Sequence, residues 1–196
     1  MARAFLRHGS NALLIGIVLA LGSLFIAGLL RFSLWAAALG AVIFFVMEYL
    51  THRFAFHAKP SNVAAVRALQ HRLHYDHHVE PGRLELFLPW WFVLPAAMAY
   101  GAVYFTLTRS PALTAGLLLG NLAAMLYYEW VHYVAHIPYV PITPIGRWMK
   151  KYHLLHHYLN EQLWFGITSP ALDVLARTYM KAADAERSTH TRFLYP

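Results

Sequence analysis

Four long apolar runs lie in the first two thirds of the chain, two on each side of the polar segment 51–85. About 20 consecutive apolar residues are what a helix needs to cross the hydrocarbon core of a bilayer. Four such runs, grouped in two pairs with very short breaks inside each pair, predict two transmembrane hairpins. The expected spans cover about 12–30, 32–50, 86–107 and 111–132. A signal peptide is the alternative for the first run, but that run is long for one and a second follows at once.

The basic residues are distributed unevenly about these spans. Of the 16 lysines and arginines, only Arg31 and Arg109 lie at the hairpin tips. Positive charge is retained on the cytoplasmic side of short loops, so both termini and the segments 51–85 and 137–196 are expected in the cytoplasm. The membrane would be the inner membrane of a bacterium or the endoplasmic reticulum of a eukaryote. Because the positive charge follows one membrane face, the net charge of +7 does not indicate a nucleic-acid partner.

Composition agrees with this assignment. Hydrophobic residues make up 59% of the chain and charged residues 13%, against about a quarter charged in soluble domains. The sequence therefore predicts an all-α integral membrane protein, a single domain over 1–196. In it, four transmembrane helices in two hairpins carry a cytoplasmic helical cap.

Histidine outnumbers acidic residues, 13 to 9, and most of it falls into two sets of five. The first set is His52, His57, His74, His77 and His78, and the second is His132, His136, His153, His156 and His157. Each set places two histidines at the end of a span and then an HxxHH sequence 17 residues later. A shift of 79 residues superimposes four members of the sets, while His52 and His132 miss by one. This pattern indicates a pseudo-repeat in which each half supplies half of one site.

The spacing within each set favours metal binding. Residues at i, i+3 and i+4 share one face of a helix, so each HxxHH sequence and the pair His132 and His136 can direct imidazoles at one point. His52 and His57 are about 140° apart on an ideal helix and converge only if the helix ends or bends between them. Imidazole suits iron, copper, nickel and zinc, and the chain has no cysteine. Ten nitrogen donors exceed what one ion can bind, which predicts two metal ions close together.

Three histidines and two acids need separate interpretation. His8 and His190 are expected on the surface, and His71 is expected either on the surface or in support of a ligand. Glu48 and Glu129 each precede a histidine by about one helical turn, at a depth where an ionised group is costly. A hydrogen bond to the second ring nitrogen of a ligand histidine would explain both acids. An ion pair with Arg53 or another base is the alternative for each.

The ordered boxes HxxxxH, HxxHH, HxxxH and HxxHH resemble the fatty acid hydroxylase/sterol desaturase superfamily, most closely its fatty acid 2-hydroxylase branch. The sequences EYLTHRFAFH at 48–57 and FGITSP at 165–170 add to the resemblance, which runs from about 47 to 179. It implies that the ten histidines surround two iron ions. It also implies activation of O2 and insertion of one oxygen into a lipid acyl chain, at the carbon next to the carboxyl or amide. A fused cytochrome b5 domain, frequent in eukaryotic members, is not seen, so a separate cytochrome b5-like or ferredoxin-like donor is expected.

Other functions remain open at this point. The same centre would serve a carotenoid or sterol hydroxylase or desaturase, because pocket shape selects the substrate. A histidine-rich membrane metal transporter is a candidate of another class, but transporter ligands lie near the middle of the spans, whereas these histidines lie at one membrane face. Zinc generally binds nitrogen sites more tightly than iron, so a purified sample can carry zinc without that being the working ion.

Overall fold

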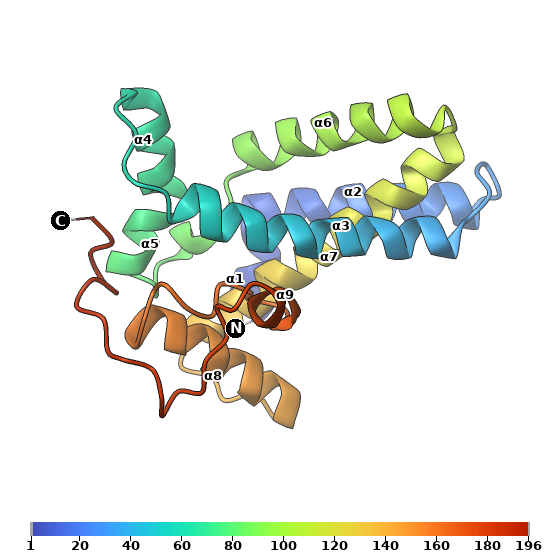
Figure 1. Cartoon of the computed structure of the whole chain (residues 1–196). Helices are drawn as coiled ribbons and strands as arrows, with labels where there is room; N and C mark the ends of the chain where they lie inside the picture. The colour runs from blue at the N-terminus through green and yellow to red at the C-terminus, as the bar shows by residue number, and fades with distance from the viewer. Residues whose placement is uncertain (1, 196) are drawn as a thin grey trace. The chain divides into compact units, whose positions relative to one another are not determined.

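A computed structural model describes residues 2–195, and in this range the chain forms helices and irregular segments without a strand (Figure 1). The helical elements in chain order are α1 (Ala2–Arg7), α2 (Gly9–Ile26), α3 (Leu34–Thr51), η1 (His52–Phe56), α4 (Ala64–Gln70), η2 (His71–Tyr75), α5 (Asp76–Val79), η3 (Leu84–Leu86), α6 (Trp90–Thr108), α7 (Pro111–His136), α8 (Pro144–Tyr158) and α9 (Ala171–Leu175). The all-helical fold class predicted from the sequence is confirmed.

Four helical stretches of the described chain are long and apolar enough to cross a membrane. They are Gly9–Ile26, Leu34–Phe56, Leu84–Thr108 and Pro111–His136. The first ends where the chain turns at Gly28, whose φ of 71° lies in the left-handed region that glycine adopts without strain.

The chain divides into two compact units, and the division falls inside α3 and α7. The first unit comprises the residues up to Phe45 together with Phe87–Glu129, and the second comprises Val46–Leu86 together with the chain from Trp130 onward. All ten histidines of the two sets belong to the second unit.

The first unit is apolar both inside and outside. Leu14, Val93 and Leu122, from α2, α6 and α7, form a buried cluster. On the outside, Ile26 is 90% exposed and Leu107 is 76% exposed. Helices that are apolar all round are typical of membrane spans, so this surface suits contact with lipid chains.

Two glycines allow α3 and α7 to pack closely within the first unit. A β-carbon at Gly120 would lie 1.8 Å from the carbonyl oxygen of Ala37, and one at Gly40 would lie 2.0 Å from that of Leu117. Any side chain at either position would therefore force the two backbones apart. Small residues at helix contacts are a usual means of close packing in membranes.

Candidate metal centre

The ten histidines come from four stretches of the second unit. These are the end of α3 with η1, the segment from η2 into α5, the last turns of α7, and the second half of α8. Nine of the ten are buried, and His136 is the partly exposed member.

His52 and His57 are brought together by a π-helical turn. In η1 the N–H of His57 donates to the carbonyl oxygen of His52 at 3.1 Å, an i to i+5 hydrogen bond. The wider turn brings residues five apart to one side, and the two ring centroids lie 5.1 Å apart. The regular α-helix ends at this point, as the sequence required, and the wider π turn is what brings the two imidazole rings together. A π turn takes up one extra residue, which accounts for the one-residue offset between His52 and His132 in the repeat.

The imidazoles gather into two groups of five, and in each group the ligand atoms lie within 4.8 Å of one another. The first histidine group is His52, His57, His74, His78 and His156, and the second histidine group is His77, His132, His136, His153 and His157. Each group takes four members from one half of the repeat and one from the other. His77 and His156 are the exchanged members, and they occupy equivalent positions, 79 residues apart. Each half thus supplies four donors to one group and one to the other.

The spacing of the nitrogen atoms in the first group suits one metal ion. The Nε2 atom of His57 lies 2.8 Å from that of His74 and 3.0 Å from that of His156. Two nitrogen ligands bound at about 2.1 Å and at right angles to each other lie about 3.0 Å apart. The observed separations are therefore those of neighbouring ligands on one ion.

The second group repeats this spacing. The Nε2 atoms of His77 and His132 are 2.8 Å apart, and those of His136 and His153 are 2.9 Å apart. The two groups adjoin where the rings of His78 and His157 stack, with centroids 4.2 Å apart. The arrangement can hold two metal ions as close neighbours.

Backbone carbonyls orient three rings of the first group. His52 Nδ1 lies 2.5 Å from the carbonyl oxygen of Phe165, and His156 Nδ1 lies 2.8 Å from that of Leu163. His78 Nδ1 lies 2.7 Å from the carbonyl oxygen of Thr191. A carbonyl oxygen only accepts, so each Nδ1 carries the proton and each Nε2 keeps its lone pair for a metal.

Burial keeps the imidazoles outside the spans neutral. It lowers the pKa of His57, His74, His77 and His156 well below the usual value, and neighbouring imidazoles add to the effect. Burial also lowers the pKa of His78 to about 3. Neutral imidazole is the form that binds metal, so these rings can act as metal ligands at physiological pH.

Unsatisfied nitrogen atoms indicate that the groups fit a metal. His52 Nε2 and both ring nitrogens of His157 are buried and make no hydrogen bond within the described chain. A buried polar atom without a partner costs about 1–3 kcal/mol. A metal ion at each group would satisfy one nitrogen of each ring, so the residues fit the two ions that the sequence pattern predicts.

Both acids accept hydrogen bonds from backbone N–H groups. Glu48 accepts hydrogen bonds from the backbone N–H of Ile167 at 2.7 Å and of Thr168 at 3.2 Å, and from the Thr168 hydroxyl. It thus fixes the loop whose Phe165 carbonyl orients His52, rather than bonding to His52 itself. Glu129 is fully buried and accepts from the N–H of Leu88 at 3.1 Å.

Asp173 organises the same loop, a role that the sequence did not reveal. Its buried carboxylate accepts from the N–H groups of Phe165 and Gly166 at 2.9 and 2.8 Å. The hydroxyls of Tyr152 and Thr178 donate to it at 2.9 and 2.7 Å. An acid beside the FGITSP sequence was the only signal, and it suggests no particular partners.

Lys150 holds the end of the helix that carries His132 and His136. Its ammonium group donates to the carbonyl oxygens of Val134, Ile137 and Tyr139 at 3.0, 2.6 and 3.1 Å. A cation at a helix C-terminus satisfies carbonyls that have no partner within the helix. Sequence reasoning did not identify this lysine, which falls where the other half of the repeat has His71.

The remaining histidines lie outside both groups. His190 is exposed, and the ring of partly buried His8 packs against Phe87 with centroids 4.6 Å apart. His71 is exposed and pairs with Asp76, 3.0 Å from Nδ1 to Oδ1. The structure does not bring these residues to the centre.

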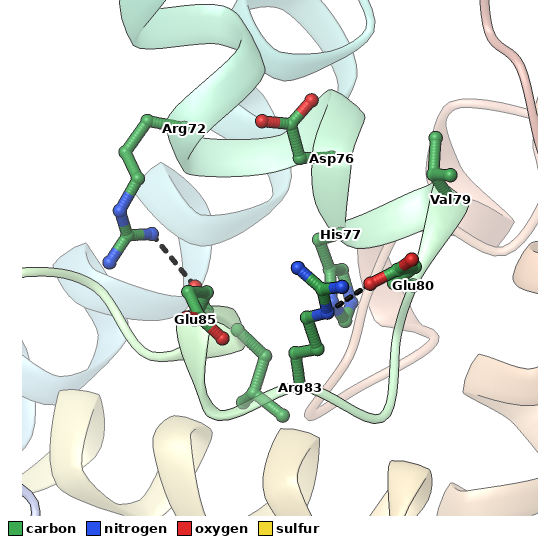
Figure 2. A pocket seen from close by; sticks show the side chains of 8 residues that line it. Arg72, Asp76, His77, Val79, Glu80, Arg83 and Glu85 are labelled. Atoms are coloured by element: carbon green, nitrogen blue, oxygen red, sulfur yellow. Dashed lines mark hydrogen bonds and ion pairs between the residues drawn. The ribbon is translucent and has the colours of Figure 1, made fainter.

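A cavity of about 250 Å³, lined by both charged and apolar side chains, adjoins the second group through His77. Figure 2 shows Arg72, Arg83 and Glu80 around it, with Arg83 paired to Glu80 and Arg72 donating to the carbonyl oxygen of Glu85. The two guanidinium groups and the neighbouring carboxylates therefore bring both positive and negative charge close to the buried His77.

Comparisons with known proteins agree with this geometry. A fatty acid hydroxylase family model matches residues 37–178. The solved structure of full-length scs7p, in which only the hydroxylase domain is visible, superimposes with a TM-score of 0.77 at 29% identity. The superposition covers 91% of this chain and 67% of that chain. The resemblance inferred from the sequence is confirmed.

Two curated relatives show the same similarity. The ceramide very long chain fatty acid hydroxylase SCS7 of Saccharomyces cerevisiae is 34% identical over 154 residues, covering 76% of this chain and 39% of that protein. The dihydroceramide fatty acyl 2-hydroxylase FAH1 of Arabidopsis thaliana is 32% identical over 150 residues, covering 71% of this chain and 58% of that protein. The chain thus spans about two fifths to three fifths of the length of these relatives.

Proposed function

The chain belongs to the fatty acid hydroxylase family, and from this premise we propose that it is a diiron monooxygenase that hydroxylates a fatty acyl chain at C2. The observation that carries the proposal is the division of ten histidines into two groups, each with the nitrogen spacing of one metal site. The ten histidines are the proposed ligands. Glu48 is proposed to hold the ligand-orienting loop, and Glu129 to hold the backbone at Leu88.

We propose iron as the metal. Removing a proton beside the acyl carbonyl would not by itself add oxygen, whereas bound iron would supply the activation of O2. Nitrogen ligands suit iron, although zinc competes for such sites. Residues of this chain keep the imidazoles neutral through burial and aim their Nε2 atoms through carbonyl contacts.

The charged side chains in the cavity beside His77 support oxidation near the polar end of the lipid. For oxidation at C2, the carboxyl or amide must lie one carbon from the reacting C–H bond. The substrate's polar end therefore has to sit next to a metal group, and the guanidinium groups of Arg72 and Arg83 offer hydrogen-bond donors there. The names of both relatives, a ceramide fatty acid hydroxylase and a dihydroceramide fatty acyl 2-hydroxylase, support an acyl substrate and do not favour a sterol, a carotenoid or metal transport.

The reaction needs a source of electrons. Inserting one atom of O2 into a C–H bond and releasing the other as water consumes two electrons and two protons. We assign their delivery to a redox protein of the cytochrome b5 or ferredoxin type. The excess of basic residues outside the hairpin tips supports placing both termini and the histidine-rich segments in the cytoplasm, where such a donor can reach them.

Lipid mass spectrometry of cells that express the chain tests the proposal. Acyl lipids are expected to gain one oxygen, placed at C2 by fragmentation. Cells with the His153→Ala variant at equal protein level should lack the product, because His153 is a fully buried member of the second group. Unchanged acyl lipids despite a folded, iron-loaded chain and a reduced donor would contradict the proposed function.

A further inference from the structure

An irregular segment near the end of the chain contacts the first histidine group. We call residues 186–195 the strap; they follow the matched family region, which ends at 178. Three hydrogen bonds join the start of the strap to the end of α8 and the residues after it. They run from Asn160 Nδ2 to the Glu186 carbonyl at 3.1 Å, from Arg187 Nη1 to the Tyr158 carbonyl at 3.1 Å, and from the Ser188 N–H to the Leu159 carbonyl at 2.8 Å.

The far end of the strap makes two hydrogen bonds to histidines. The carbonyl oxygen of Thr191 accepts from His78 Nδ1 at 2.7 Å. The hydroxyl of Tyr195 donates to the backbone carbonyl of His57 at 2.7 Å, and its ring lies 5.7 Å from that of Tyr75. His57 and His78 are both members of the first histidine group.

These contacts distinguish the two groups. Within the described residues, the hydrogen bonds from the strap to histidines go to the first group only. The Thr191 carbonyl fixes the proton of His78 on Nδ1, which leaves Nε2 with the lone pair that points to His74, 3.0 Å away. The Tyr195 hydroxyl restrains the backbone just where the π turn presents the His57 ring.

We propose that the strap is a positioning element for one of the two metal ions, the one held by the first histidine group. This inference rests on the proposed function, because it requires both groups to bind metal. Groups that orient a ligand histidine typically contribute ten- to a hundredfold to metal affinity. Losing the strap contacts should therefore weaken metal binding at the first group by about that factor and leave the second group unchanged.

A strap that only stabilised the fold would behave differently. General loosening of the second unit would release both ions faster, since the groups adjoin through His78 and His157. Selective release of one ion is thus the result that separates positioning from simple stabilisation.

The test measures iron release from the full chain in detergent. The protein is loaded with Fe(II), its iron content is measured by mass spectrometry, and release to a coloured Fe(II) chelator is followed over time. His74→Ala and His157→Ala assign the two release phases to the first and second groups. The test variants are Tyr195→Phe and a chain ending after Thr189, which keeps the three anchoring hydrogen bonds. Tyr179→Phe, which removes a hydroxyl from a 45% exposed tyrosine, is the matched control.

We expect both test variants to accelerate the release phase assigned to the first group. The acceleration should be about ten- to a hundredfold in the shortened chain and smaller in Tyr195→Phe. The second phase and the Tyr179→Phe control should match the wild type. Equal acceleration of both phases, or unchanged release in both variants, would overturn the strap proposal and leave the diiron centre intact. A wild-type chain that binds no iron would overturn the proposed function and this inference with it.

Discussion

Replacing either His77 or His156 with alanine is expected to reduce hydroxylation by at least about a hundredfold and to leave one metal site defective, because each removes a metal ligand. The two histidines are the members exchanged between the groups. Each substitution therefore damages the group whose other four histidines come from the opposite half of the repeat. His77→Ala should weaken the second group, and His156→Ala the first. Iron content and product formation, measured on the same purified samples, check this expectation.

The control for this pair is His71→Ala, an exposed histidine near His77 that makes a surface contact with Asp76. It should keep both its iron and its activity. Wild-type activity with full iron content in both test variants would contradict the assignment of the two histidines as ligands.

Asp173→Ala is expected to destabilise the second unit by about 3 kcal/mol or more, since it leaves four buried donors without their acceptor. Those donors come from Tyr152, Phe165, Gly166 and Thr178. Because the loop they hold presents the Phe165 carbonyl to His52, metal binding should weaken as well. Denaturant unfolding in detergent, followed by circular dichroism, measures the first effect, and iron content measures the second.

Asp173→Asn provides a graded comparison, because the amide keeps one acceptor oxygen and the size of the side chain. It should fall between the wild type and alanine. Asp184→Ala, at an exposed acid in the same part of the chain, should stay close to the wild type. A loss below about 1 kcal/mol in Asp173→Ala would show that the loop is held by other contacts.

The fold class and the metal-binding pattern were predictable because both depend on local periodicity. Apolar runs of membrane length mark the spans, and the i, i+3, i+4 spacing in His153, His156 and His157 survives in α8 as a regular helix. The 79-residue repeat also predicted that the two sets would be used together. These features need no knowledge of which segments meet in space.

The pairing within the centre could not be read from the repeat. The exchange of His77 and His156 depends on how α5 and α8 pack, and no local pattern encodes it. The offset between His52 and His132 was visible, but its cause, a π turn stabilised by the hydrogen bond from His57 to His52, is a property of backbone geometry.

The groups that support the centre were also hidden from the sequence. Sequence reasoning sought carboxylate partners for the ring nitrogens, whereas the structure uses the carbonyl oxygens of Phe165, Leu163 and Thr191. Every residue has a carbonyl, so residue type gives no signal. Asp173 and Lys150 act on backbone groups for the same reason and were equally inconspicuous.

The most direct test of the central claim is a reaction of the iron-loaded protein with a fatty acyl lipid, a reduced donor and ¹⁸O2. If the two histidine groups hold a diiron centre that inserts oxygen, the product will carry one ¹⁸O atom at C2, and its amount will fall with the iron content when metal is removed by a chelator. A product labelled from water instead, or an undiminished yield from the metal-free chain, would contradict the account.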